Sequence, residues 1–194
     1  MDALVVEDLI KRYGRTTAVD GLSFAVPQGS VCGFLGPNGA GKTTTLRILL
    51  GLSRATSGTA QTKGRAGGVL DHDGFHPARA VWNELSLAAA RAGKRHADID
   101  AALAAANLTH AADKTVGACS HGTRRRLSLA AALIAEPDVL LLDEPASGLD
   151  PHALRALRTR LQDHARNGGT VLLSSHVLED VAATCDRVGV VNRG

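Results

Sequence analysis

The sequence predicts an α/β protein with a mostly parallel central sheet, flanking helices, an N-terminal antiparallel β portion and an inserted helical subdomain. Two short apolar runs, Val31–Leu35 and Val139–Leu142, show no alternation of polar and apolar residues. Such runs are typical of strands that are buried on both faces of a parallel sheet. Helical patterns stand between the runs, and this alternation predicts the α/β class. An Ala-rich, mainly helical stretch at 78–112 predicts the subdomain.

The other elements are predicted from local patterns along the chain. Residues 4–26 combine short β-like runs with turn signals at Tyr13-Gly14 and Asp20-Gly21, which is typical of a β portion. Residues 53–67 are polar and rich in turn formers, and no element is predicted there. Further helices are expected at 42–50, 124–135, Pro151–Arg166 and 177–185, and further strands at 170–174 and 187–191.

The 194 residues are enough for one domain with a real hydrophobic core. We therefore expect a single domain over 1–194. Its core is expected at 1–72 and 130–194, and its helical subdomain at about 73–129. No internal repeat or low-complexity linker interrupts this organisation.

Composition and charge exclude several classes of protein. Apolar residues make up 44% and charged residues 21% of the sequence, which argues against disorder. Aromatic residues are only 3%; because nucleic-acid binders often use aromatic platforms for bases, no nucleic-acid partner is expected. The net charge is +3. The densest basic cluster, residues 124–126, is either a solvated helix face or a patch that faces phosphate or anionic lipid.

The cysteines and the hydropathy indicate a cytoplasmic protein. Cys32, Cys119 and Cys185 are far apart and lack the spacing of a metal site, which is typical of a reducing compartment. No stretch approaches the roughly 18–20 apolar residues that cross a bilayer. The first residues show no signal-peptide pattern. Only a partner is therefore expected to hold this chain at a membrane.

The run G-P-N-G-A-G-K-T at 36–43 fits the phosphate-loop pattern G-x-x-x-x-G-K-[ST]. Glycines let the backbone curl until its N–H groups form a nest for an anion, and the helix that starts near Lys42 adds the positive end of its dipole. Lys42 is expected to reach the β- and γ-phosphates of ATP, Thr43 to ligate Mg²⁺, and Thr44 to contact the α-phosphate. The predicted cofactor-binding residues here are Gly36, Asn38, Gly39, Ala40, Gly41, Lys42, Thr43 and Thr44.

An acidic pair, Asp143 and Glu144, follows the predicted buried strand Val139–Leu142. Ligands of open α/β sheets bind at the carboxyl edge of the strands, so this pair is expected beside the phosphate loop. Asp143 is expected to hold Mg²⁺, through water, and Glu144 to orient and polarise the attacking water. The alternative is a solvent-exposed acidic turn after a strand.

These residues resemble the nucleotide-binding subunit of an ABC transporter, and the resemblance covers nearly the whole chain in the family's order. It implies the fold of a P-loop NTPase. The run S-G-L-D at 147–150 resembles the loop that crosses to a partner subunit, which adds Asp150 to the site. His176 resembles the switch histidine that senses the γ-phosphate. Tyr13 stands where the family places an aromatic ring against adenine, or is a partly buried strand residue.

Two motifs depart from the family's pattern. The signature, close to L-S-G-G-Q in the family, is C-S-H-G-T at 119–123. It retains Ser120 and Gly122, a hydroxyl and a close backbone N–H that cap the ATP of the opposite subunit. A Gln that contacts Mg²⁺ in the family is aligned with Asp71, or alternatively with His72. A carboxylate there can ligate Mg²⁺ but adds negative charge near phosphate; the other possibility is that both are only loop residues.

The resemblance implies an ATP-hydrolysing subunit that pairs with a second copy of itself or with a homologous ATPase subunit. It also implies a multi-span membrane permease as a separate chain, whose coupling helices would contact residues near 74–82. The run G-F-H-P at 74–77 is reminiscent of bacterial drug- or bacteriocin-export ATPases. We expect export, at the cytoplasmic face of the cell membrane. The alternatives are a degenerate regulatory ATP-binding cassette and a non-transport ABC ATPase that acts on nucleic acid or ribosomes.

Overall fold

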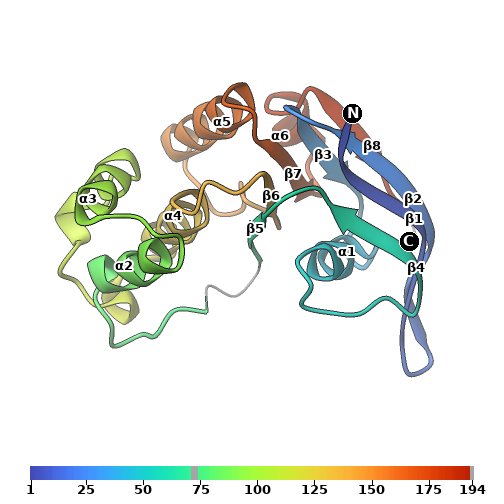
Figure 1. Cartoon of the computed structure of the whole chain (residues 1–194), viewed down its shortest axis with the longest axis horizontal. Helices are drawn as coiled ribbons and strands as arrows, with labels where there is room; N and C mark the ends of the chain where they lie inside the picture. Colours follow the sequence, from blue (N-terminus) through green and yellow to red (C-terminus); the bar gives the residue numbers. More distant parts are fainter. Residues whose placement is uncertain (71–73, 193–194) are drawn as a thin grey trace. The chain divides into compact units, whose positions relative to one another are not determined.

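The computed structural model describes residues 1–70 and 74–192 (Figure 1). The chain divides into two compact units. The first consists of residues 1–70 and 138–194, and the second of residues 71–137. The second unit is thus inserted between two segments of the first.

A parallel five-stranded sheet forms the centre of the first unit, in the order β5-β6-β7-β3-β8. All four neighbouring pairs are parallel. The three inner strands are almost entirely buried, which explains their continuous apolar sequences. The predicted α/β class with a mostly parallel sheet is confirmed. The strands are β3 (Val31–Leu35), β5 (Ala66–Val69), β6 (Val139–Leu142), β7 (Thr170–Ser175) and β8 (Arg187–Val190).

A second, antiparallel sheet has the order β2-β1-β4. Strands β1 (Asp2–Tyr13) and β2 (Thr16–Pro27) form a long hairpin, and β4 (Ser57–Thr62) pairs with the other edge of β1. The predicted N-terminal antiparallel portion is therefore confirmed, but β4 and β5 were not foreseen. Their sequences, S-G-T-A-Q-T and A-G-G-V, lack the apolar pattern of a strand, and pairing with β1 and β6 gives them their conformation.

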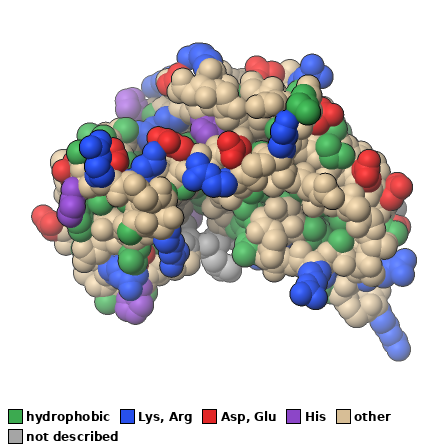
Figure 2. Space-filling model, in the orientation of Figure 1, with side chains coloured by type: hydrophobic (Ala, Val, Ile, Leu, Met, Phe, Trp, Pro, Cys, Tyr) green, Lys and Arg blue, Asp and Glu red, His purple; other side chains and the backbone are tan. Residues whose placement is uncertain are grey.

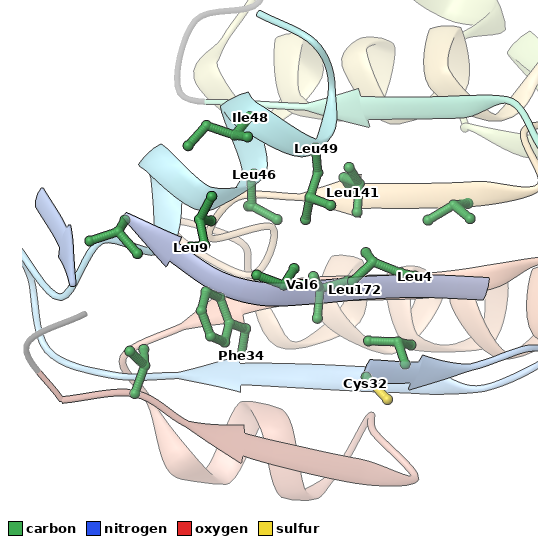
Figure 3. Packing of buried hydrophobic residues seen from close by; sticks show 14 of the residues in the cluster. Leu4, Val6, Leu9, Cys32, Phe34, Leu46, Ile48, Leu49, Leu141 and Leu172 are labelled. Carbon is green, nitrogen blue, oxygen red and sulfur yellow. The ribbon is translucent and has the colours of Figure 1, made fainter. Parts of the chain in front are cut away.

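The two sheets and helix α1 (Lys42–Leu49) share one hydrophobic core. Figure 3 shows its side chains converging from β1, β3, β6, β7 and α1. Leu46 of α1 is fully buried in this core, and it anchors the helix that begins at Lys42. The remaining helices of this unit are α5 (Pro151–Arg166) and α6 (Leu178–Ala182).

The second unit is helical and has its own core. Its helices are α2 (Val81–Arg91), α3 (His96–Ala105) and α4 (His121–Leu133), with two 3₁₀ turns at Thr109–Ala111 and Val116–Ala118. The side chains of Leu85, Leu108 and Leu127 are fully buried. Alanines also pack in this core, because their small side chains let backbones approach closely. None of the helices in residues 1–70 and 74–192 is long and apolar enough to cross a membrane.

Charges are mixed over the surface. On the face drawn in Figure 2, Lys and Arg side chains stand among Asp and Glu side chains rather than in one field of a single sign. The cluster Arg124, Arg125 and Arg126 lies on α4, and all three side chains are half-buried.

Leu46→Ala is expected to lower the free energy of unfolding by about 2–5 kcal/mol, because it removes a fully buried side chain and leaves a cavity. Urea unfolding followed by circular dichroism measures this change. Leu52→Ala makes the same chemical change at a side chain that is 68% exposed, and should cost little. Equal effects of the two substitutions would show that α1 is not anchored through Leu46.

Candidate functional site

The phosphate loop lies between the end of β3 at Leu35 and the start of α1 at Lys42. Gly39 and Gly41 have φ of 84° and 89°, in the left-handed region that favours glycine. A Cβ on Gly41 would lie 2.5 Å from the carbonyl oxygen of Ala18 on β2. Gly41 is therefore required both by its backbone conformation and by the close approach of β2.

Lys42 is buried and satisfied by the loop itself. Its side chain is 6% exposed, and Nζ donates hydrogen bonds to the carbonyl oxygens of Gly36 (2.7 Å) and Pro37 (3.1 Å). Nζ also lies 3.5 Å from Oε1 of Glu144. A buried ammonium group needs such partners. These partners hold the ammonium group at the rim of the loop. The N-cap residue of α1 is Gly41, so no side chain caps the N–H groups of the first turn.

The other loop residues differ in exposure. Asn38 and Gly39 are exposed at the turn, Ala40 is buried in the core, and Thr43 and Thr44 are half-buried in the first turn of α1.

The structure brings the loop and the acidic pair together. Asp143 follows β6 and is 1% exposed, and its Oδ2 accepts a hydrogen bond from Oγ1 of Thr43 at 2.5 Å. A hundred residues separate these two side chains in the sequence. The alternative of a solvent-exposed acidic turn does not fit a carboxylate that is this deeply buried.

Glu144 joins three elements. Its φ is +46°, a left-handed value that a non-glycine residue adopts only when its surroundings hold it there. Its Oε1 faces Lys42, and its Oε2 lies 3.0 Å from Nδ1 of His176. His176 follows β7 and is 50% exposed. One carboxylate is thus shared between the loop's cation and a histidine that solvent can reach.

The sequence analysis assigned no role to Ser174, yet the structure places it at the centre of the site. Its side chain is fully buried. Its Oγ donates to Oδ1 of Asp143 at 2.5 Å and accepts from the N–H of Glu144 at 3.0 Å. The signal that could have found it is a hydroxyl at the end of an otherwise apolar strand, because buried polar groups are almost always hydrogen-bonded.

Tyr13 lies at the end of β1, where it pairs with Thr16 across the hairpin. Tyr13 is 48% exposed and therefore does not belong to the core. Nζ of Lys11 lies 4.6 Å from the centroid of its ring. Ala18, farther along the same hairpin, packs its carbonyl group against Gly41. The hairpin that carries Tyr13 therefore contacts the phosphate loop.

The signature residues lie at the start of α4, in the second unit. Ser120 is the N-cap, and its Oγ accepts from the N–H of Thr123 at 3.2 Å and lies 2.9 Å from the Thr123 hydroxyl. The second contact depends on the hydroxyl group of Thr123. A Cβ on Gly122 would meet no heavy atom within 4 Å, so packing within the chain does not require this glycine.

Asp150 caps the first turn of α5. Its Oδ1 accepts hydrogen bonds at 2.9 Å from the N–H groups of His152 and Ala153. This cap accounts for an Asp followed by Pro at the start of a helix. Asp71 and His72, the two candidates for the position of the family's Gln, lie outside the described residues.

The cysteines are packing residues in this structure. Burial raises the pKa of the Cys185 thiol to about 12 and also raises the pKa of the Cys32 thiol. Both thiols are unpaired and would remain protonated at neutral pH, so they are poor nucleophiles.

The family sequence model described as ABC transporter matches residues 19–147, which is more than half of the chain. The chain belongs to the ABC transporter family. The matched span contains the phosphate loop, the signature and the acidic pair.

Curated members of the ABC transporter family resemble the chain over nearly its full length. It is 43% identical to the Nod factor export ATP-binding protein I of Ralstonia nicotianae over 210 aligned residues, which cover 98% of this chain and 64% of that protein. It is 38% identical to the bacitracin transport ATP-binding protein BcrA of Bacillus licheniformis, over 96% of this chain and 66% of that protein. The chain therefore spans just under two thirds of the length of these two relatives.

Solved structures agree on the fold. A structure described as the ATP binding subunit of an ABC transporter has a TM-score of 0.91 and 25% identity, and the match covers 99% of this chain and 87% of that chain. A nucleotide-free ATP-binding cassette from an ABC transporter has a TM-score of 0.84 at 23% identity, covering 100% of this chain and 89% of that chain. The P-loop NTPase fold implied by the sequence is confirmed.

Gly41→Ala is expected to destabilise the protein by more than the ~1–2 kcal/mol of a left-handed backbone alone, because its Cβ would also collide with Ala18. Urea unfolding measures the difference. Gly51→Ala is the matched control, since Gly51 has φ of 72° but an open environment. If the two variants lose the same stability, the contact between Gly41 and β2 does not constrain the loop.

Proposed function

We propose that the chain is the ATP-binding and ATP-hydrolysing subunit that powers a separate membrane permease in ABC-type export. The observation that carries this proposal is the meeting of Thr43 with Asp143, and of Glu144 with both Lys42 and His176, within the first unit. Phosphoryl transfer depends mainly on positioning and on charge neutralisation, which such an arrangement can supply. The name of the Nod factor export ATP-binding protein I supports export as the direction.

Nucleotide binding is proposed to exchange the partners of Lys42. Its Nζ now donates to the loop's own carbonyl oxygens and faces Glu144. Phosphate oxygens are stronger acceptors for an ammonium group than neutral carbonyls. When Lys42 turns to the β- and γ-phosphates, the carboxylate of Glu144 loses its ion pair with the Lys42 ammonium group. It can then accept a hydrogen bond from a water molecule.

Magnesium would be held by the hydroxyl of Thr43 and, through water, by the carboxylate of Asp143. These are hard oxygen donors of the kind that Mg²⁺ prefers, and Mg²⁺ is usually bound by one or two carboxylates together with substrate phosphates. Within residues 1–70 and 74–192, no group of three or more His, Cys, Asp or Glu side chains could hold a metal, so phosphate and water would complete the shell. Bound there, the ion supplies charge neutralisation for the phosphates.

Glu144 is proposed to orient and polarise the attacking water. His176, whose Nδ1 touches Oε2 of Glu144, holds that carboxylate in place and is exposed enough to contact the γ-phosphate. Tyr13 is proposed to stack on adenine, since its ring is accessible on the hairpin that packs against the loop. Asp71 remains a proposed additional ligand of Mg²⁺.

A second ATP-binding subunit, identical or homologous, is the proposed partner across the nucleotide. Ser120 and Gly122 would cap its ATP, and Asp150 would lie in the crossing loop. The open environment of Gly122 supports this role, because close approach by an outside group explains a glycine that the chain's own packing does not require.

The permease is proposed to contact the second unit near residues 74–82. An open concavity of about 460 Å³ lies there, lined by His76, Ala78, Arg79, Ala80, Asn83 and Thr115. Its wall is held by the buried carboxylate of Glu84, which accepts from the N–H of His76 (2.9 Å) and from Nη1 of Arg79 (3.0 Å). Such a contact would hold the subunit at the cytoplasmic face of the membrane.

A regulatory cassette that binds ATP without turnover is the second candidate. The observation that favours it is the engagement of Ser120 with Thr123 in the altered signature. Steady-state ATPase activity, measured with and without the permease, distinguishes the two candidates. Co-purification with RNA instead of a membrane protein would favour a non-transport ABC ATPase.

Glu144→Gln is expected to leave ATP binding intact, to slow hydrolysis by about 100-fold or more, and to accumulate as a dimer with ATP. Phosphate release and size-exclusion chromatography measure these effects. Glu7→Gln, at an exposed residue of β1, should leave both unchanged. Unchanged turnover in Glu144→Gln would remove Glu144 from the mechanism.

Lys42→Ala is expected to weaken ATP binding by at least about tenfold, because the charge-assisted hydrogen bonds to phosphate are lost. Titration with a fluorescent ATP analogue measures the affinity. Lys63→Ala removes an exposed lysine of the same unit and serves as the control. Equal affinities of the two variants would refute the assignment of Lys42.

A further inference from the structure

Ser174 occupies a position that no motif of the site accounts for. It lies on β7, the central strand of the parallel sheet, between β6 and β3. Leu142 pairs with Leu173 in the β6–β7 ladder, so the two acids leave β6 at the level of Ser174. The Ser174 hydroxyl on β7 therefore lies beside the point where the chain leaves the sheet after β6.

The directions of its two hydrogen bonds are fixed by chemistry. A carboxylate oxygen can only accept, so the Ser174 hydroxyl proton goes to Oδ1 of Asp143. Its oxygen is then left to accept the N–H of Glu144. One hydroxyl thus holds the side chain of the first acid and the backbone of the second.

The backbone of Glu144 explains why such a contact is needed. The N–H of Asp143 still bonds to the carbonyl oxygen of Val69 on β5, as expected for a continued ladder. At Glu144 the chain turns into the left-handed region, with φ of +46°, and its N–H leaves the ladder. Ser174 gives that N–H an acceptor in a buried place, where an unpaired donor is costly.

Asp143 is held from two sides by hydroxyl groups. Thr43 donates to Oδ2 from the phosphate loop, and Ser174 donates to Oδ1 from β7. The bond from Thr43 belongs to the loop that must adapt to nucleotide, whereas Ser174 is fixed in the sheet. The carboxylate keeps its orientation through Ser174 when the Thr43 hydroxyl is drawn to another partner.

We propose that Ser174 is the positioning residue of this site: it orients the carboxylate of Asp143 toward the divalent cation and fixes the backbone turn that aims Glu144 at the phosphate loop. The proposal rests on the function proposed above. It predicts two separable effects, because the hydrogen bonds of the Ser174 hydroxyl go to the two acids, whereas Lys42 bonds to the loop. Affinity for metal-free nucleotide depends on Lys42 and the loop, whereas the gain in affinity caused by Mg²⁺ depends on Ser174.

The decisive comparison is Ser174→Thr against Ser174→Val, since these side chains have nearly the same shape and differ in the hydroxyl group. A fluorescent ATP analogue is titrated in EDTA and again in MgCl₂, and steady-state hydrolysis gives kcat and KM. Ser174→Val should bind the analogue in EDTA like Ser174→Thr. Its gain in affinity on adding Mg²⁺ and its kcat should each be lower by about tenfold or more, the scale of a hydrogen bond to a charged group. KM for ATP should change less than kcat.

Thr170→Val is the matched control on the same strand. Thr170 is also fully buried, and its Oγ1 accepts from the N–H of Gly29 at the opposite end of β7. This variant loses a comparable buried hydroxyl far from the acids, so its Mg²⁺ dependence should equal that of the unmodified protein. If Ser174→Val does not fold, Ser174→Ala removes the hydroxyl without adding volume and is measured in its place.

Two results would overturn the proposal. One is an equal Mg²⁺ dependence and kcat in Ser174→Val and Ser174→Thr, with circular dichroism showing both to be folded. The other is an equal loss in Thr170→Val, which would make the effect one of general stability. Failure of the underlying function is recognised separately, since the unmodified protein would then show no ATP hydrolysis, with or without the permease.

Discussion

The buried carboxylate of Asp143 is the constraint on which this site depends. A carboxylate that is 1% exposed must receive hydrogen bonds, and two of its donors come from different parts of the chain, Thr43 at the start of α1 and Ser174 at the end of β7. Satisfying this one side chain therefore ties the phosphate loop to the central strand of the sheet. The apolar packing of Leu46 holds the other side of α1, so the loop is fixed between a hydrophobic anchor and a polar one.

Strand β7 joins the parts of the site. Its Ser174 contacts both acids, the carbonyl oxygen of Ser175 accepts from the N–H of Gly36 in the loop, and His176 follows directly and contacts Glu144. Three successive residues thus reach the two other motifs of the site, the acidic pair and the phosphate loop. This arrangement follows from the order β5-β6-β7-β3-β8, which places β7 between the strand that leads to the acids and the strand that leads to the loop.

The pairing of Lys42 with Glu144 gives the site a defined starting state. The cation and the carboxylate satisfy one another while the loop's own carbonyl groups hold the ammonium. A nucleotide that draws Lys42 to its phosphates changes the surroundings of Glu144 at the same moment. We propose in this way that Lys42 links the binding of ATP to the release of the Glu144 carboxylate for hydrolysis. This link requires no movement of the sheet.

Much of this protein could be predicted from the sequence, because the relevant signals are local. The phosphate loop is one continuous run at 36–43, the strands β3 and β6 are continuous apolar runs, and α5 begins at its Asp-Pro start as expected. Strands β4 and β5 escaped prediction, because pairing with β1 and β6 rather than their own composition makes them strands.

The sequence by itself determined the residues that are proposed to carry the chemistry: a loop of glycines ending in Lys42 and Thr43, an acidic pair after a buried strand, and a histidine after another. Only the tertiary structure decided how they are joined, since Thr43 and Asp143 are a hundred residues apart, and the sequence does not show which groups the Ser174 hydroxyl meets. The physical reason is that burial determines which hydrogen-bond partners a polar group can have. A hydroxyl in water has many equivalent partners, whereas one enclosed between strands has only those that the fold brings to it.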